Sequence, residues 1–353
     1  MEIASGKAVK NWLITGGCGF IGTSLIEHLL KGQSGFKIRV LDNLSVGSRE
    51  DLAEVCDFLE IPAGPPKDAR SSFVELLAGD IKDFETCLRA CEGIDVVVHL
   101  AANTGVGPSV EDPRADMESN VIGIFNMLEA SRRMGVGKFV FASSGAPIGE
   151  VEPPIHEEKA PRPVSPYGAS KLAGEGYCSA YFRTFALKTI SLRFGNVYGP
   201  RSKHKSSVVA KFLKQALKGE NLEIYGDGSQ TRDFIYIKDL IGAIDLAVEP
   251  QPNKSVPPAP ASGPAVREPW GEVFQIATYR ETTVKEIAEK IRELIGMETG
   301  IKVEVIYSAP RLGDVKRNYS DISKAGKILG YAPVFGLEGG LKATFDYFRS
   351  RAC

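Results

Sequence analysis

The sequence predicts an α/β fold in which a doubly wound parallel sheet is followed by a smaller mixed α/β lobe towards the C-terminus. Short apolar runs alternate with helical patterns through the first two-thirds of the 353 residues. The runs are apolar throughout, which is typical of parallel strands covered by helices on both faces. After about Gly199 the pattern changes to polar loops and shorter elements.

Each predicted element follows from one of these patterns. The predicted helices cover 20–30, 83–90, 116–134 and 166–185, with 207–217 and 283–295 in the smaller lobe. The predicted strands cover 11–15, 37–41, 72–77, 96–100, 138–142 and 188–192, and later 222–225, 273–276 and 302–307. We expect a first domain over 1–199 and a second lobe over 200–353, with some segments returning to the sheet and a Pro-rich surface excursion at 249–270.

Composition excludes several classes of protein. The formal net charge of −1 provides no basic field for nucleic acid or an anionic membrane. No segment approaches the roughly 20 apolar residues of a membrane helix, and the N-terminal residues lack the apolar core of a signal peptide. The six cysteines show no metal-ligand spacing. We therefore expect a cytoplasmic protein without a structural metal.

A dinucleotide site is predicted where the first strand meets the first helix. Gly16, Gly19 and Gly22 lie at the strand-to-helix turn, where glycines allow close approach of a pyrophosphate to the helix N-terminus. The second strand ends in Asp42, whose carboxylate can accept hydrogen bonds from an adenosine ribose and would repel a 2′-phosphate. This pattern favours NAD over NADP. Asp80 follows the third predicted strand and His99 lies at the end of the fourth, where it is expected to be structural.

A reacting group is predicted around the helix at 166–185. Tyr167 and Lys171 are four residues apart, hence on one helix face. A neighbouring ammonium and a positive nicotinamide ring are expected to lower the pKa of the phenol towards the working range. Ser144 ends the strand before this helix, where its hydroxyl can reach the same substrate oxygen.

Together these motifs resemble the extended short-chain dehydrogenase/reductase family, and within it the group of UDP-glucose 4-epimerase and related UDP-sugar epimerases. The resemblance implies a Rossmann-type domain, NAD as cofactor, a UDP-sugar substrate, and Ser144, Tyr167 and Lys171 as catalytic residues. It also implies a homodimer formed through the helices at 116–134 and 166–185. The implied cofactor-binding residues are Gly16, Gly19, Phe20, Ile21, Gly22, Asp42, Asn43, Asp80, Ile81, Leu100, Ala101, Ala102, Asn120, Tyr167 and Lys171. The implied substrate-binding residues are Ser144, Asn196, Arg232, Arg311, Asp314 and Asn318.

Departures from the family pattern refine the expected activity. Gly145 and Ala146 stand where sugar-nucleotide dehydratases carry an Asp-Glu pair, which favours inversion at carbon 4 of a UDP-hexose through a 4-keto intermediate. Asn318 replaces a bulky tyrosine of glucose-restricted epimerases, so UDP-N-acetylhexosamines are further expected substrates. The alternatives are a UDP-glucuronate 4-epimerase, a dehydratase or reductase of the same family and, remotely, a non-enzymatic NAD-sensing regulator. The substitutions Pro147-Ile148 and Ala277-Thr278-Tyr279 have no interpretation from sequence alone.

Overall fold

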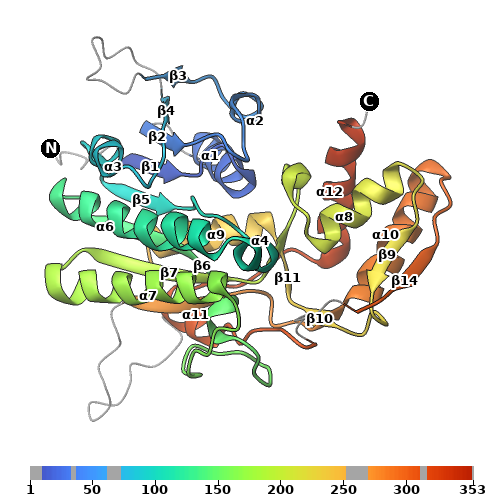
Figure 1. The fold of residues 1–353 in the computed structure, drawn as a ribbon. Helices are drawn as coiled ribbons and strands as arrows, with labels where there is room; N and C mark the ends of the chain where they lie inside the picture. Colours follow the sequence, from blue (N-terminus) through green and yellow to red (C-terminus); the bar gives the residue numbers. More distant parts are fainter. Residues whose placement is uncertain (1–9, 33–36, 62–72, 252–268, 311–315, 352–353) are drawn as a thin grey trace, which may run out of the picture.

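A parallel sheet of eight strands forms the centre of the computed structural model, which describes residues 10–32, 37–61, 73–251, 269–310 and 316–351 (Figure 1). The strand order is β12-β7-β6-β5-β1-β2-β4-β3. Successive strands are added on one side of β1 as far as β4, and from β5 onward they are added on its other side, so the order switches between β1 and β5. The carboxyl ends of strands at such a switch form the crevice in which doubly wound folds bind ligands. The strands are β1 Asn11–Thr15, β2 Lys37–Asp42, β3 Leu59–Glu60, β4 Val74–Ala78, β5 Val96–His99, β6 Lys138–Ser144, β7 Lys188–Phe194 and β12 Glu272–Ile276.

Helices cover both faces of this sheet because its strands are apolar on both sides. On β1, Trp12 and Ile14 pack into one core with α1 (Phe20–Gly32) and α9 (Ile237–Val248). Leu13 points into the other core, with α3 (Phe84–Cys91), α6 (Gly123–Arg133) and α7 (Pro166–Phe185). Figure 1 shows α6 and α7 side by side along that second face. The predicted doubly wound architecture is therefore confirmed.

The helix predicted over 116–134 is wrong in its start and in its regularity. The chain forms α4 (Val106–Glu111) and α5 (Pro113–Met117), then a π-helical turn at Glu118–Ile122, and only then α6. The turn contains Asn120, whose buried amide bonds to the backbone of Asn103 and to Asp116. A π-helical turn inserts an extra residue into a helix and occurs frequently at functional sites.

The smaller lobe lies beside the carboxyl edge of the sheet (Figure 1). Its helices α8 (Val208–Leu217) and α10 (Val284–Thr299) pack on the parallel pair β9 (Leu222–Tyr225) and β14 (Val305–Ser308). The strand predicted at 302–307 begins only at Val305. The remaining elements are α2 Arg49–Ala53, β8 Asn196–Tyr198, β10 Thr231–Arg232, β11 Phe234–Tyr236, β13 Thr282–Thr283, α11 Ser323–Ile328, α12 Leu337–Ser350, and 3-10 turns at Ala146–Ile148 and Ser202–His204.

The chain returns to the large sheet after building part of the smaller lobe. Strand β12 pairs in parallel with β7 at the edge of the sheet, with Phe274 opposite Leu192. Within the described ranges, no helix is both long and apolar enough to cross a membrane.

Candidate active site

The glycine turn, residues 16–22, connects β1 to α1 and is packed against the segment that follows β5. Gly16 has a φ of +68°, and a Cβ placed there would lie 2.8 Å from the backbone nitrogen of Ala101. A Cβ on Gly22 would lie 2.5 Å from Cα of Gly17 and 2.6 Å from the Gly16 carbonyl oxygen. Only glycine fits either position without moving backbone. The turn therefore has the bare backbone and the helix N-terminus that a dinucleotide pyrophosphate requires.

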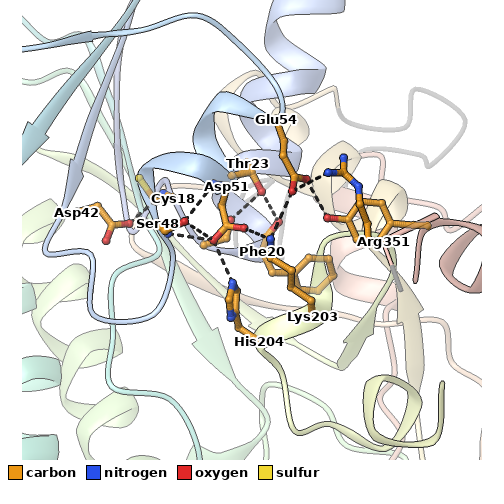
Figure 2. Close-up of polar contacts among 12 residues, drawn as sticks. Cys18, Phe20, Thr23, Asp42, Ser48, Asp51, Glu54, Lys203, His204 and Arg351 are labelled. Atoms are coloured by element: carbon orange, nitrogen blue, oxygen red, sulfur yellow. Dashed lines mark hydrogen bonds and ion pairs between the residues drawn. The ribbon is translucent and has the colours of Figure 1, made fainter. Parts of the chain in front are cut away.

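Asp42 is held at the end of β2 by this turn. Its carboxylate accepts hydrogen bonds from the backbone N–H of Cys18 at 2.9 Å and of Leu44 at 2.8 Å (Figure 2). Burial raises the pKa of Asp42, and the two N–H groups act against that rise. Asn43 donates to the carboxylate of Asp80 at 3.3 Å. The structure thus brings Asp42, Asn43 and Asp80 together, as a site for the adenosine end of the cofactor requires.

The segment after β5 forms the other wall of the crevice. The backbone N–H of Ala101 donates to the Thr15 hydroxyl at 3.2 Å, which fixes Leu100 and Ala101 beside the glycine turn. Asn120 donates to the Asn103 carbonyl oxygen at 2.8 Å and accepts from its N–H at 2.8 Å. In this structure, therefore, Asn120 orders the 100–103 segment.

Two further side chains on the cofactor side are buried. Ile81 is buried in the core beside Gly123, where a Cβ would lie 2.4 Å from the Ile81 side chain. His99 is bonded to the Thr15 hydroxyl at 2.8 Å, and its ring stacks on Phe141. Burial lowers the pKa of His99 to about 3, so its imidazole is neutral. As expected, His99 has a structural role.

Ser144, Tyr167 and Lys171 converge at the carboxyl end of β6. Helix α7 starts with the Ser165 hydroxyl accepting the N–H of Gly168, which places Tyr167 and Lys171 in its first two turns. The Lys171 ammonium donates to the Ala142 carbonyl oxygen at 2.9 Å and lies 5.8 Å from the centre of the Tyr167 ring. Ser144 lies near enough to Tyr167 to lower the pKa of its phenol. Because the sequence predicts a catalytic role for them, we refer to these three residues as the catalytic triad.

The ionisation of the triad differs from the expectation of a lowered phenol pKa. Burial raises the pKa of Tyr167 to about 12, and Ser144 offsets only part of that rise. Burial lowers the pKa of Lys171 to about 8, and the nearby carboxylate of Asp116 offsets part of this fall. Desolvation therefore dominates the pKa of the phenol, and the Lys171 ammonium is not among the groups that lower it. A positive nicotinamide ring beside the phenol would favour the phenolate.

The expected substrate residues fall into three groups. Asn196 is exposed on β8, and its backbone N–H donates to the carbonyl oxygen of Asp233 at 2.7 Å. Asp233 directly follows Arg232, so this bond holds the backbone of Asn196 beside the segment that carries Arg232. Asn318 faces Gly145, since its amide nitrogen lies 3.9 Å from where a Gly145 Cβ would be. Asn318 is thus next to the serine of the triad. Arg311 and Asp314 lie outside the described residues.

Asp233 is a functional candidate that the sequence interpretation missed. It is 2% exposed, and its carboxylate accepts from Thr278 N–H at 2.8 Å, Tyr279 N–H at 3.0 Å and Ser320 N–H at 3.3 Å. It joins the segment that carries Asn318 to the 277–279 turn, where the family glycines are replaced. Tyr279 has a φ of +59°, so this chain keeps the left-handed backbone without the glycine. The only signal in the sequence was an aspartate directly after Arg232.

An ion-pair cluster that sequence patterns did not predict ties helix α2 to the 3-10 turn at 202–204 (Figure 2). Asp51 contacts Lys203 at 2.5 Å and His204 at 3.0 Å. Glu54 contacts Arg351 at 3.2 Å and accepts from the Tyr347 hydroxyl at 2.9 Å. Asp51, Glu54 and His204 also line a small cavity with Cys18, Gly19, Phe20, Thr23 and Arg201. The cluster therefore closes the outer side of the glycine turn.

A dinucleotide turn at the switch point of the sheet and a Ser-Tyr-Lys triad at the same edge define a nicotinamide-dependent protein of the short-chain dehydrogenase/reductase class. The chain belongs to the NAD dependent epimerase/dehydratase family, whose sequence profile matches residues 12–257. This membership confirms the extended short-chain dehydrogenase/reductase resemblance and NAD as the cofactor.

Relatives with named activities cover the whole fold. UDP-glucose 4-epimerase of Mycolicibacterium smegmatis is 34% identical over 346 residues, covering 96% of this chain and 99% of that protein. The structure of UDP-glucose 4-epimerase with UDP-glucose from Thermotoga maritima matches with a TM-score of 0.82 and 35% identity, covering 97% of this chain and 100% of that one. UDP-glucuronic acid 4-epimerase from Bacillus cereus, in complex with UDP-glucuronic acid and NAD, matches with a TM-score of 0.80 and 29% identity, covering 97% and 99%.

Proposed function

We propose that this protein is an NAD-dependent isomerase that inverts carbon 4 of a UDP-hexose, with UDP-glucose and UDP-galactose as the primary pair. The observation that carries the proposal is the convergence of Ser144, Tyr167 and Lys171 beside the glycine turn. We assign NAD binding mainly to residues 1–199 and UDP-sugar binding mainly to residues 200–353.

NAD bound along the glycine turn, Asp42 and the 100–102 segment supplies a hydride acceptor and donor for carbon 4 of the sugar. Tyr167 removes the proton from the 4-hydroxyl and later returns it, while Ser144 holds the same oxygen by a hydrogen bond. Lys171 keeps a positive charge within reach of the phenol, which favours its ionised form.

Inversion requires that the 4-keto sugar present its other face before the hydride returns. We infer that Asn196, Arg232 and Arg311 hold the diphosphate while the sugar ring turns, since a guanidinium binds phosphate oxygens in a bidentate way. Asp314 is proposed to bind the uridine ribose.

Gly145 and Ala146 support epimerisation over dehydration. Loss of water across carbons 5 and 6 needs an acid and a base near those carbons. The two residues that follow Ser144 have no ionisable side chain. A sugar in this site can therefore exchange its proton and hydride at carbon 4 without losing its 6-hydroxyl.

The deciding experiment incubates the protein with UDP-glucose, UDP-N-acetylglucosamine or UDP-glucuronic acid, separately and without added reductant. Products are separated by anion-exchange chromatography and identified by NMR. Formation of the 4-epimer supports the proposal, whereas a stable 4-keto product indicates a dehydratase. No change in any of the three sugars would favour the NAD-sensing regulator.

The substrate range depends on the space between Gly145 and Asn318. Asparagine and glycine leave room for a larger group than a tyrosine at 318 would allow, so we propose that UDP-N-acetylhexosamines are also converted. Asn318→Tyr is expected to lower kcat/KM for UDP-N-acetylglucosamine at least tenfold more than for UDP-glucose, about 1.4 kcal/mol of discrimination. Equal effects on the two sugars would contradict this assignment.

We also propose a homodimer through α6 and α7. Phe125 and Tyr177 lie edge to face, with ring centres 5.7 Å apart, and remain 38% and 40% exposed. Exposed neighbouring apolar residues of this kind are typical of protein interfaces. Phe125→Glu/Tyr177→Glu should yield a monomer in analytical ultracentrifugation, while Tyr307→Glu, at a more exposed tyrosine on β14, should leave the dimer intact. An unchanged sedimentation coefficient for the first variant would exclude this face.

A further inference from the structure

A buried ion pair joins helix α7 to the sheet directly behind the catalytic triad. Arg193 of β7 contacts Glu175 of α7 through two bonds, Nε to Oε1 at 2.8 Å and Nη2 to Oε2 at 2.6 Å. Both side chains are only 4% exposed. A bidentate arginine–carboxylate contact fixes orientation as well as distance. The pair therefore sets the rotation of α7 against the sheet.

The same carboxylate also holds the strand that carries the triad serine. Ser143 donates to Oε1 of Glu175 at 2.6 Å, and it lies opposite Arg193 in the register of β6 and β7. Ser143 directly precedes Ser144. Glu175 is four residues after Lys171 and eight after Tyr167, so these three residues share one face of α7. One carboxylate thus links the strand that carries Ser144 to the helix that carries Tyr167 and Lys171.

Stability alone does not account for this arrangement. Two buried charges lose their hydration, and an apolar pair of similar volume is often as stable or more stable. Nη1 of Arg193 is buried and has no hydrogen-bond partner among the residues that the structure describes, which adds a further cost. The Ser143–Glu175–Arg193 contacts specify one register between helix and strands, which an apolar contact would not do as strictly.

We propose that Glu175 and Arg193 are positioning residues that set the height and rotation of α7, so that the Tyr167 phenol meets Ser144 and the substrate hydroxyl. The proposal rests on the proposed function only in naming that hydroxyl as the reacting group. Neither residue touches the reacting atoms, so the expected loss is in kcat, with KM for the UDP-sugar unchanged.

The charge of Glu175 adds a second, measurable effect. Its carboxylate is one of the groups that raise the pKa of Lys171, which burial lowers to about 8. Glu175→Gln removes that support, so Lys171 should lose its proton at a lower pH. The groups that act on Lys171 or are acted on by it are Asp116 of α5, Glu175 and Cys178 of α7, Lys205 after the 202–204 turn, and His99 of β5, with Tyr167 in ring contact.

The first test separates positioning from stability. Glu175→Leu/Arg193→Met replaces both charges by apolar side chains and should melt within about 3 °C of wild type. Its kcat should fall about 10²-fold, the effect of a displacement near 1 Å at a reacting group. A folded double variant with wild-type kcat would overturn the proposal.

The second test uses matched single substitutions and can still be carried out if the double variant fails to fold. Glu175→Gln should lower kcat and move the alkaline limb of the pH profile to lower pH. The control Glu75→Gln changes a similarly buried carboxylate paired with Arg39 between β2 and β4, remote from the triad, and should leave kcat and the profile unchanged. Coincident profiles for the two variants would refute positioning. If Glu175→Gln unfolds as well, Glu175→Asp, which keeps the charge but shortens its reach, is judged by its kcat alone.

Failure of the proposed function is distinguishable from failure of this inference. If wild type converts no UDP-sugar, the epimerase proposal fails, and the titration of the buried Lys171 ammonium, followed by NMR of 13C-labelled lysine, replaces turnover. Glu175→Gln must then shift the midpoint of that titration to lower pH, whereas Glu75→Gln must not. Equal midpoints would overturn the positioning role.

Discussion

Gly22→Ala is the sharpest test of the glycine turn. A Cβ at this position would lie 2.6 Å from the Gly16 carbonyl oxygen, about 0.8 Å short of the 3.4 Å at which ordinary contact begins. The nearest atoms all belong to the backbone of Gly16 and Gly17, so no side chain can rotate away. Overpacking of this kind costs about 1–3 kcal/mol of stability.

The same displacement should weaken the cofactor site. Opening the turn by most of 1 Å moves the N–H groups that face the pyrophosphate, and a misplacement of that size typically costs about 10²-fold, or about 2.7 kcal/mol of binding free energy. Isothermal titration calorimetry with NAD measures the Kd, and thermal unfolding without NAD measures the stability term separately.

Gly339→Ala is the matched control for this substitution. Gly339 lies in α12, where an added Cβ would meet nothing within 4 Å. It should leave NAD affinity unchanged and raise stability by up to about 1 kcal/mol, because alanine is the better helix former. If Gly22→Ala binds NAD with the wild-type Kd and melts at the wild-type temperature, the role assigned to the glycine turn is wrong.

Three further predictions concern the triad, the buried histidine and the ion-pair cluster. Tyr167→Phe should lower kcat by about 10²–10⁴-fold with no loss of thermal stability, and a rate above one-tenth of wild type would contradict proton transfer by this phenol. Because the pKa of His99 is about 3 in the folded chain against an ordinary 6.5, the unfolded chain binds the extra proton below 6.5 and stability falls with acidification, by up to about 1.4 kcal/mol per pH unit. Urea titrations at pH 7 and pH 5 should show this loss of unfolding free energy in wild type and a smaller loss in His99→Gln. Equal losses in the two proteins would argue against a buried neutral imidazole. Asp51→Asn removes its ion pairs to Lys203 and His204 and should lower stability by up to about 1 kcal/mol and speed NAD release several-fold in stopped-flow measurements, whereas an unchanged release rate would show that the cluster does not retain the cofactor.

Local patterns predicted most of the large sheet and the triad. The strands 11–15, 96–100 and 138–142 are short apolar runs in a parallel sheet, so their identity depends on residues within each run. Tyr167 and Lys171 share a helix face through their spacing alone. These features needed no knowledge of which distant segments meet.

The features that were missed depend on contacts between distant segments. The carboxylate of Asp233 holds backbone more than 40 residues away, at Thr278, and Asp51 meets His204 across 153 positions. The π-helical turn at 118–122 is fixed by the bonds of Asn120 to Asn103 and Ser170. A pattern of hydrophobic spacing contains no information on such partners, so only the folded chain reveals them.

The return of β12 to the edge of the large sheet has a practical consequence for how the molecule can be divided. The family profile ends at residue 257, before this strand begins at Glu272. A fragment cut there would leave the backbone of β7 unpaired along a buried, apolar strand and would remove Phe274 and Ile276 from the core. Bare strand edges pair with other chains, so such a fragment should aggregate even though it retains the glycine turn and the triad. The dinucleotide-binding half of this protein is thus completed by residues that come late in the chain.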